Sequence, residues 1–162
     1  MVQPVITAAN LTVGYLKSLV ADIPDSRFAE LPAGLPNHPA WVIGHVVFAY
    51  NSATKLLGGS PAVAEGHDAK YGIGSKPSTT RSDYPSKDVL LAMLDTAHKS
   101  AIDAISANFA ASADKPNPIE GFSKMAPTIG DAVVFLVTSH NAGHVGQVSS
   151  WRRAAGLPGL GF

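Results

Sequence analysis

The chain alternates between stretches with helical hydrophobic spacing and stretches rich in proline and glycine. In the first helical stretch Leu11, Tyr15 and Leu19 fall on one face, and Pro24 ends the pattern. The last helical stretch opens at Thr128 with a sequence that resembles a capping box, and a glycine follows its end. Four helices are therefore predicted, over residues 4–22, 38–58, 86–111 and 128–155.

Two of the connections between these helices are long. Residues 59–85 are rich in glycine, serine, proline and threonine, and residues 112–127 contain three prolines. The apolar run 133–137 has the composition of a strand, but the cap before it and the periodic polar residues after it favour a helix. The predicted fold class is all-α: a four-helix bundle formed by a single domain, residues 1–162, with a long crossover between its second and third helices.

Composition excludes several classes of protein. The 162 residues include no cysteine, which rules out disulfides, thiolate metal sites and a catalytic cysteine. Twelve basic residues balance twelve acidic ones, and a nucleic-acid binder would show a basic excess. Residues 132–151 lack charged side chains but contain too many polar ones for a membrane span. The N-terminus has no signal-peptide pattern, so we expect a cytoplasmic protein with neither a membrane nor a nucleic acid as partner.

His140 and His144 are the most informative residues of the chain. Their spacing places both rings on one side of the last helix, with Cβ atoms about 5–6 Å apart. Two imidazoles so placed suit one metal ion bonded at about 2.0–2.1 Å. Chance alone gives about 0.2 such pairs in a chain with six histidines, so the spacing is a weak motif by itself. The uncharged helix around the pair, with Gly143 and Gly146 beside it, indicates close packing or open space there.

His45 is the third candidate ligand. It lies in the uncharged segment 31–54, with Trp41 four residues before it and Phe48 three residues after it, and this pattern turns it inward. For His45 alone, a core histidine bonded to a backbone carbonyl is the simpler interpretation. An inward-facing histidine pair on a second uncharged helix makes three converging histidines the favoured interpretation. A bundle without metal, whose histidines are satisfied by internal hydrogen bonds, is the alternative.

The remaining histidines have plainer explanations. His38 stands at the start of the second helix, where capping or pocket lining fits it better than ligation. His67 in the long loop is expected in solvent, and His98 is expected on the surface of the third helix. Gln147 and Trp41 are candidates for lining the pocket or for supporting a ligand histidine, although inter-helix packing explains Gln147 equally well.

No carboxylate neighbours the histidines in the sequence. Asp131 lies two to three turns before the pair and is better explained as a helix cap. A general base from the loops stays open, and the candidates are Glu65, Asp68 and Glu120.

The order of these motifs resembles a known family. In the second helix a tryptophan precedes a histidine by four residues, and the last helix has HxxxH followed by the tail HVGQVSSWRRAAGLP. Over nearly the whole chain this arrangement is similar to the DinB/YfiT-like family of metal-binding four-helix-bundle proteins. The resemblance implies one divalent ion, nickel, zinc or iron, held by His45, His140 and His144.

The resemblance also bears on activity and partners. Members of the family are often homodimers, and some are thiol-dependent transferases or isomerases that use mycothiol, bacillithiol or glutathione. Three histidine ligands leave a tetrahedral ion one open position, which is typical of catalytic sites. We therefore expect a metal-dependent enzyme that activates water or a diffusible thiol for transfer to, or hydrolysis of, a small molecule. A non-catalytic metal-binding or stress-response bundle is the alternative. The uncharged surfaces of the first and last helices favour a homodimer.

Overall fold

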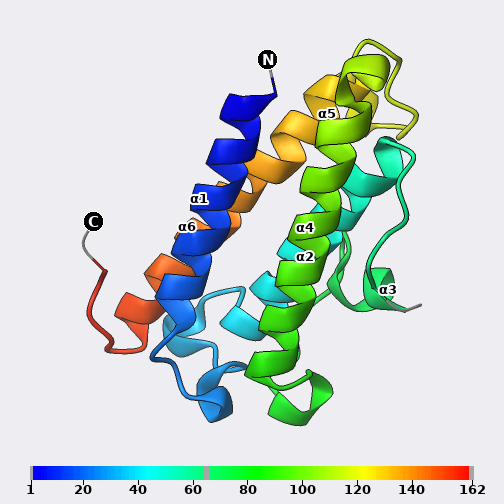
Figure 1. Ribbon diagram of the computed structural model, residues 1–162. Helices are drawn as coiled ribbons and strands as arrows, with labels where there is room; N and C mark the ends of the chain where they lie inside the picture. The colour runs from blue at the N-terminus through cyan, green and yellow to red at the C-terminus, as the bar shows by residue number, and fades with distance from the viewer. Residues whose placement is uncertain (1, 64–65, 161–162) are drawn as a thin grey trace.

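Four long helical segments form a bundle in the computed structural model, which describes residues 2–63 and 66–160 (Figure 1). Each of the first two begins with a proline in its first turn, where the missing N–H costs no hydrogen bond. The elements are α1 (Gln3–Val20), α2 (Pro39–Leu56), the short helix α3 (His67–Tyr71), α4 (Lys87–Ser112), α5 (Ile129–Phe135), a π-helical turn (Leu136–His140) and α6 (Asn141–Ala154).

The connection between α2 and α4 crosses the length of the bundle. Near the end of α4, Asn108 Nδ2 donates to the carbonyl of Leu57, which directly follows α2, at 3.0 Å. The ends of α2 and α4 therefore lie together, and both helices run in the same direction (Figure 1). The all-α bundle and its long crossover were predicted from the sequence, and the structure confirms both.

The predicted loop 59–85 contains a helix that the sequence pattern did not indicate. This helix, α3, lies against α2 at Gly44, and a Cβ atom built on that glycine would come within 2.2 Å of the Tyr71 ring. The missing side chain of Gly44 thus lets α3 pack directly on the helix that carries His45. The long connection places α3 beside the middle of α2.

The predicted single helix 128–155 is divided by the π-helical turn. Its start is as predicted, because Thr128 and Asp131 form a capping box. Thr138 then bonds the carbonyl of Val134 through its hydroxyl, at 2.6 Å, within the turn. A π-helical turn adds a residue to one helical turn and so changes which side chains face inward after it. His140 is the last residue of this turn.

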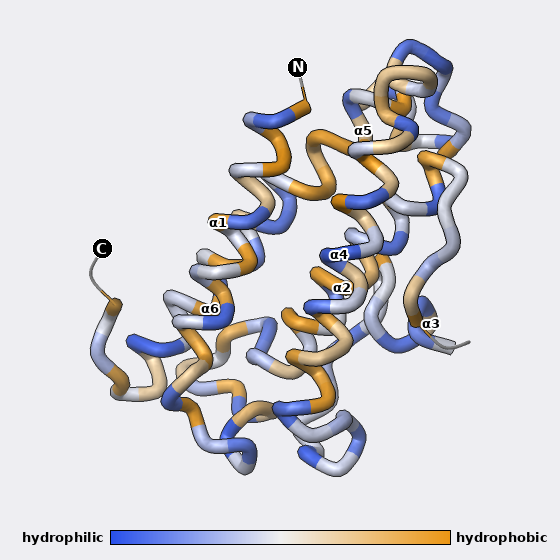
Figure 2. The backbone as a smooth tube through the Cα atoms, in the orientation of Figure 1, coloured by the Kyte–Doolittle hydropathy of each residue, from blue (hydrophilic) through white to orange (hydrophobic). Residues whose placement is uncertain are grey.

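Nearly all of the buried apolar side chains belong to one cluster that spans all four long segments. Apolar residues recur along each helix in Figure 2. Arg152 of α6 is fully buried and joins the end of this segment to α1, through the Leu19 carbonyl and an ion pair with Asp22. None of the described helices is long and apolar enough to cross a membrane.

Candidate metal centre

His45 from α2 meets His140 and His144 from the α5–α6 segment. One ring nitrogen of each histidine lies within 4.8 Å of the other two, and no described carboxylate belongs to this group. The Nε2 atoms of His45 and His140 are 3.2 Å apart. Two nitrogens bonded at about 2.0–2.1 Å to one tetrahedral ion lie about 3.3 Å apart. His45 and His140 thus lie at the spacing that one ion requires, and His144 completes the group of three residues singled out in the sequence.

The other ring nitrogen of each histidine is held by an oxygen atom. A carbonyl or side-chain amide oxygen can only accept a hydrogen bond, so each of these Nδ1 atoms carries the ring proton. Each Nε2 atom then keeps its lone pair for the common centre. The pairs are His45 with the carbonyl of Tyr71 (2.5 Å), His140 with Oδ1 of Asn141 (3.1 Å) and His144 with Oε1 of Gln147 (3.1 Å).

The donor set fits a divalent transition metal. Burial lowers the pKa of His45 and His140, and burial together with the two neighbouring imidazoles lowers the pKa of His144 to about 4. All three rings are therefore neutral near pH 7, which is the form that binds a metal. Neutral imidazoles suit zinc, nickel and iron alike, so the donor set is compatible with each of these ions.

Aromatic rings surround the three histidines. Trp41, one turn before His45, stacks on it with ring centroids 4.7 Å apart, and its indole N–H donates to Ser75. Phe135 lies edge-on to His140 at 5.7 Å. Whereas His45 is only 5% exposed, His140 and His144 are half-buried. The centre is therefore open to solvent on its α6 side and closed on its α2 side.

The buried histidines predict that the metal-free protein loses stability in mild acid. Burial lowers the pKa of all six histidines below the ordinary value of 6.5. Well above pH 6.5 these side chains are neutral in both the folded and the unfolded chain. As the pH falls from 6.5 toward 4, the unfolded chain takes up protons that the folded chain does not, so the free energy of unfolding decreases. His144 contributes up to about 3 kcal/mol, at about 1.4 kcal/mol per pKa unit.

Denaturant unfolding in the presence of a chelator, repeated at several pH values, measures this loss. The ion-paired carboxylates contribute little to the loss of unfolding free energy in this pH range. Hydrogen bonds from Arg152 and Arg81 lower the pKa of Asp22 and Asp25, respectively, below 3.8, so their contribution is lost only in stronger acid. A free energy of unfolding that stays constant between pH 6.5 and 4 would contradict the burial of the histidines.

The other histidines lie outside the metal group. His38 caps α2: its Nδ1 accepts the N–H of Trp41 at 3.2 Å, and its Nε2 bonds the carbonyl of Ser78 at 2.9 Å. The prediction that His67 lies in solvent is wrong, because it is buried in α3 and its Nε2 bonds the carbonyl of Gly44 at 2.9 Å.

His98 also differs from its predicted surface position. It is half-buried on α4, with its ring edge-on to that of Tyr50 at a centroid distance of 5.2 Å. The charged neighbours of His98 in the sequence occupy the solvent side of the helix, and the histidine itself turns toward α2.

Neither of the two described candidates for a general base, Asp68 and Glu120, belongs to the histidine group. Asp68 is paired with Lys55 at 3.2 Å, Asp131 belongs to the capping box, and Glu120 is exposed. Glu65 lies outside the described residues. Gln147, in contrast, bonds His144 directly, and the same oxygen also accepts a hydrogen bond from Asn37.

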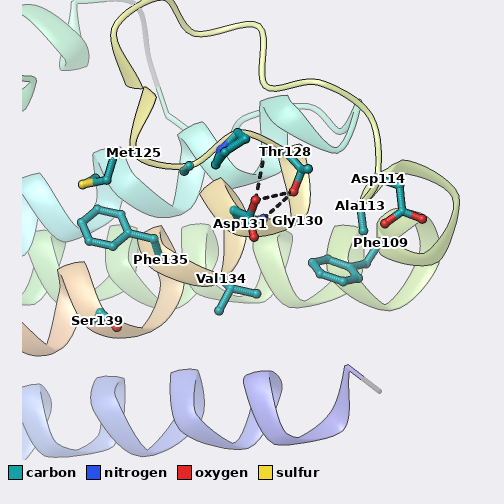
Figure 3. Close-up of a pocket in the computed structure, with 12 residues that line it drawn as sticks. Phe109, Ala113, Asp114, Met125, Thr128, Gly130, Asp131, Val134, Phe135 and Ser139 are labelled. Atoms are coloured by element: carbon teal, nitrogen blue, oxygen red, sulfur yellow. Dashed lines mark hydrogen bonds between the residues drawn. The ribbon is translucent and has the colours of Figure 1, made fainter. Parts of the chain in front are cut away.

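A cavity of about 590 Å³ lies between the end of α4 and the outer face of α5 (Figure 3). Phe109, Val134 and Phe135 supply apolar walls, and the capping box of α5 supplies polar ones. None of the three histidines lines this cavity. It meets the candidate metal centre through Phe135, whose ring also contacts His140.

Comparison with known proteins agrees with this architecture. Residues 11–148, which include all three histidines, match the family model of the DinB superfamily. The chain belongs to the DinB superfamily, as its resemblance indicated. No curated protein matches the chain significantly.

Proposed function

We propose that the protein is a metal-dependent enzyme in which His45, His140 and His144 hold one divalent ion, nickel, zinc or iron. Its reaction is transfer to, or hydrolysis of, a small molecule. The observation that carries this proposal is the convergence of one ring nitrogen from each of three histidines, whose Nδ1 atoms each lie within hydrogen-bonding distance of an oxygen. Such oxygens orient histidine ligands and raise their basicity.

The chain's own residues define what the centre can do. A bound ion would lower the pKa of a coordinated water or diffusible thiol and polarise a substrate carbonyl. Three protein ligands leave a fourth position, and the half-buried His140 and His144 turn the open side of the centre toward solvent. Trp41 and Phe135 exclude water from the flanks and present apolar surface to a small substrate. The cytoplasmic location expected from the sequence stays a prediction.

Metal analysis and a turnover screen test the proposal. We expect one divalent ion per chain after dialysis against nickel, zinc or iron salts. Binding of paramagnetic nickel should quench the fluorescence of Trp41, which stacks on His45, and leave that of Trp151 in the core largely unchanged. The loaded protein is then screened with low-molecular-weight thiols and electrophiles. A protein that binds no metal contradicts the proposal, and metal binding without turnover favours the non-catalytic metal-binding bundle.

The proposal includes a homodimer. Leu11 on α1 is 69% exposed, and beside it a groove runs between α1 and α6, with Ala142 and Gly146 among its small residues. Exposed apolar helix surface that the core does not use is typical of an interface. Light scattering at micromolar concentration should give twice the mass of one chain. A single species with the mass of one chain would contradict the dimer.

A further inference from the structure

The side-chain oxygen of Gln147 accepts two hydrogen bonds. One comes from Nδ1 of His144 at 3.1 Å, and the other comes from Nδ2 of Asn37 at 2.9 Å. An amide oxygen has two lone pairs, so both are in use. Asn37, far from the histidine pair in sequence, thus reaches the metal centre through a single intermediate residue.

The backbone fixes Asn37 in place. Pro36 precedes it, and the next residue is His38, which is fully buried and caps α2. Pro39 then begins the helix. Because this short segment is restrained by two prolines and a buried cap, Asn37 holds a constant position from which its amide can orient that of Gln147.

Apart from Asn37, the surroundings leave the Gln147 side chain free to turn. A cavity of about 290 Å³ lies beside it, lined also by Asn37 and by Gly143 and Gly146 of α6. A Cβ atom built on either glycine would meet nothing within 4 Å. Packing therefore does not decide whether Gln147 presents its oxygen or its NH₂ group to His144, and hydrogen bonding must decide it.

We propose that Asn37 is a positioning residue that fixes, through Gln147, which ring nitrogen of His144 carries the proton. Asn37 presents an N–H donor to Gln147, so the side-chain oxygen of Gln147 must face Asn37 to accept this hydrogen bond. The same oxygen faces His144 and requires a proton on Nδ1, which leaves the Nε2 lone pair directed at the centre. A turned amide would present N–H to Nδ1, move the proton to Nε2 and block that ligand atom. The consequence for metal rests on the proposed function, whereas the position of the proton does not.

The variant Asn37→Asp tests this directly. Its carboxylate only accepts hydrogen bonds, so Gln147 should turn its NH₂ group toward it. In metal-free protein at about pH 8, where neutral histidine predominates, ¹⁵N NMR should show the His144 proton on Nδ1 in the wild type and on Nε2 in the variant. The dissociation constant for Zn²⁺ should rise about 10–100-fold, as is usual when the support of a ligand histidine is lost.

Two further variants separate positioning from general damage. Asn108→Asp removes another bond from an asparagine amide to an oxygen, at Leu57, and should leave the proton and the zinc affinity unchanged. The second variant combines Asn37→Ala with Gln147→Glu. The carboxylate introduced at position 147 presents an oxygen to His144 in every orientation, so the ring proton of His144 should lie on Nδ1.

The outcomes distinguish the inference from the proposed function. A proton that stays on Nδ1 in Asn37→Asp, or a double variant that keeps it on Nε2, would overturn the inference. The predicted proton positions in a protein that binds no zinc would support the inference and reject the metal-dependent function.

Discussion

Replacing His144 by alanine should abolish metal binding and leave the helical fold in place. The buried apolar cluster spans all four long segments, whereas an ion would join only α2 to the start of α6. Removing one of three ligands leaves His45 and His140, a weak pair for any divalent ion. Bound metal per chain and far-ultraviolet circular dichroism of the purified variant measure the two effects separately.

The variant His98→Ala is the matched control. Like His144, His98 is half-buried, and burial lowers its pKa. Unlike His144, it packs on Tyr50 and lies outside the group of three histidines. The variant should keep stoichiometric metal. Retained metal in His144→Ala would remove His144 from the ligand set. An unfolded His144→Ala protein would show that this histidine is structural and would favour a metal-stabilised binding bundle over an enzyme.

The three histidines could be singled out from the sequence because helical spacing is local. An i, i+4 pair necessarily shares a face, and the aromatic neighbours of His45 place it on the apolar side of its helix. Of the groups that hydrogen-bond the outer nitrogens of these rings, Gln147 was a candidate from the sequence, whereas the others were not. The carbonyl of Tyr71 is a backbone atom that any residue would supply, and Asn37 reaches Gln147 only in the folded chain.

The long helices could likewise be predicted, because several turns of periodic apolar residues and recognisable caps define them. The short helix α3 has only five residues, too few to establish a period. The π-helical turn Leu136–His140 has only five residues within a longer helical pattern, so the sequence indicated one continuous helix. Both features depend on tertiary packing, and both position residues at the candidate centre.

His67 and His98 show why burial is harder to predict than helix formation. A histidine in a glycine-rich loop, or one among charged residues, is usually exposed. His67 is instead buried, because α3 packs on α2 and offers its ring the Gly44 carbonyl. His98 is half-buried, because its side of α4 faces α2. In each case a contact distant in sequence decides the environment.

Replacing Gly44 by alanine should both displace α3 and lower the affinity of the candidate centre for zinc. The new methyl carbon would lie 2.2 Å from ring atoms of Tyr71, and that ring is buried against His67 and Tyr84. The ring cannot turn aside, so α3 must move, and the carbonyl that holds His45 moves with it. We expect a loss of about 1–3 kcal/mol in the free energy of unfolding, as for other overpacked cores. Zinc affinity should fall about 10–100-fold because His45 loses its support.

Gly14→Ala in α1 makes the same change where nothing lies within 4 Å of the new atom. Alanine is favoured over glycine inside a helix by about 0.8–1.0 kcal/mol, so this control should become more stable and keep its zinc affinity. Denaturant unfolding and zinc titration of the two variants side by side isolate the collision with Tyr71 from the general effect of alanine. If Gly44→Ala is stabilised as Gly14→Ala is, α3 does not pack on α2 at this glycine. If Gly44→Ala loses stability but keeps full zinc affinity, the Tyr71 carbonyl does not orient His45.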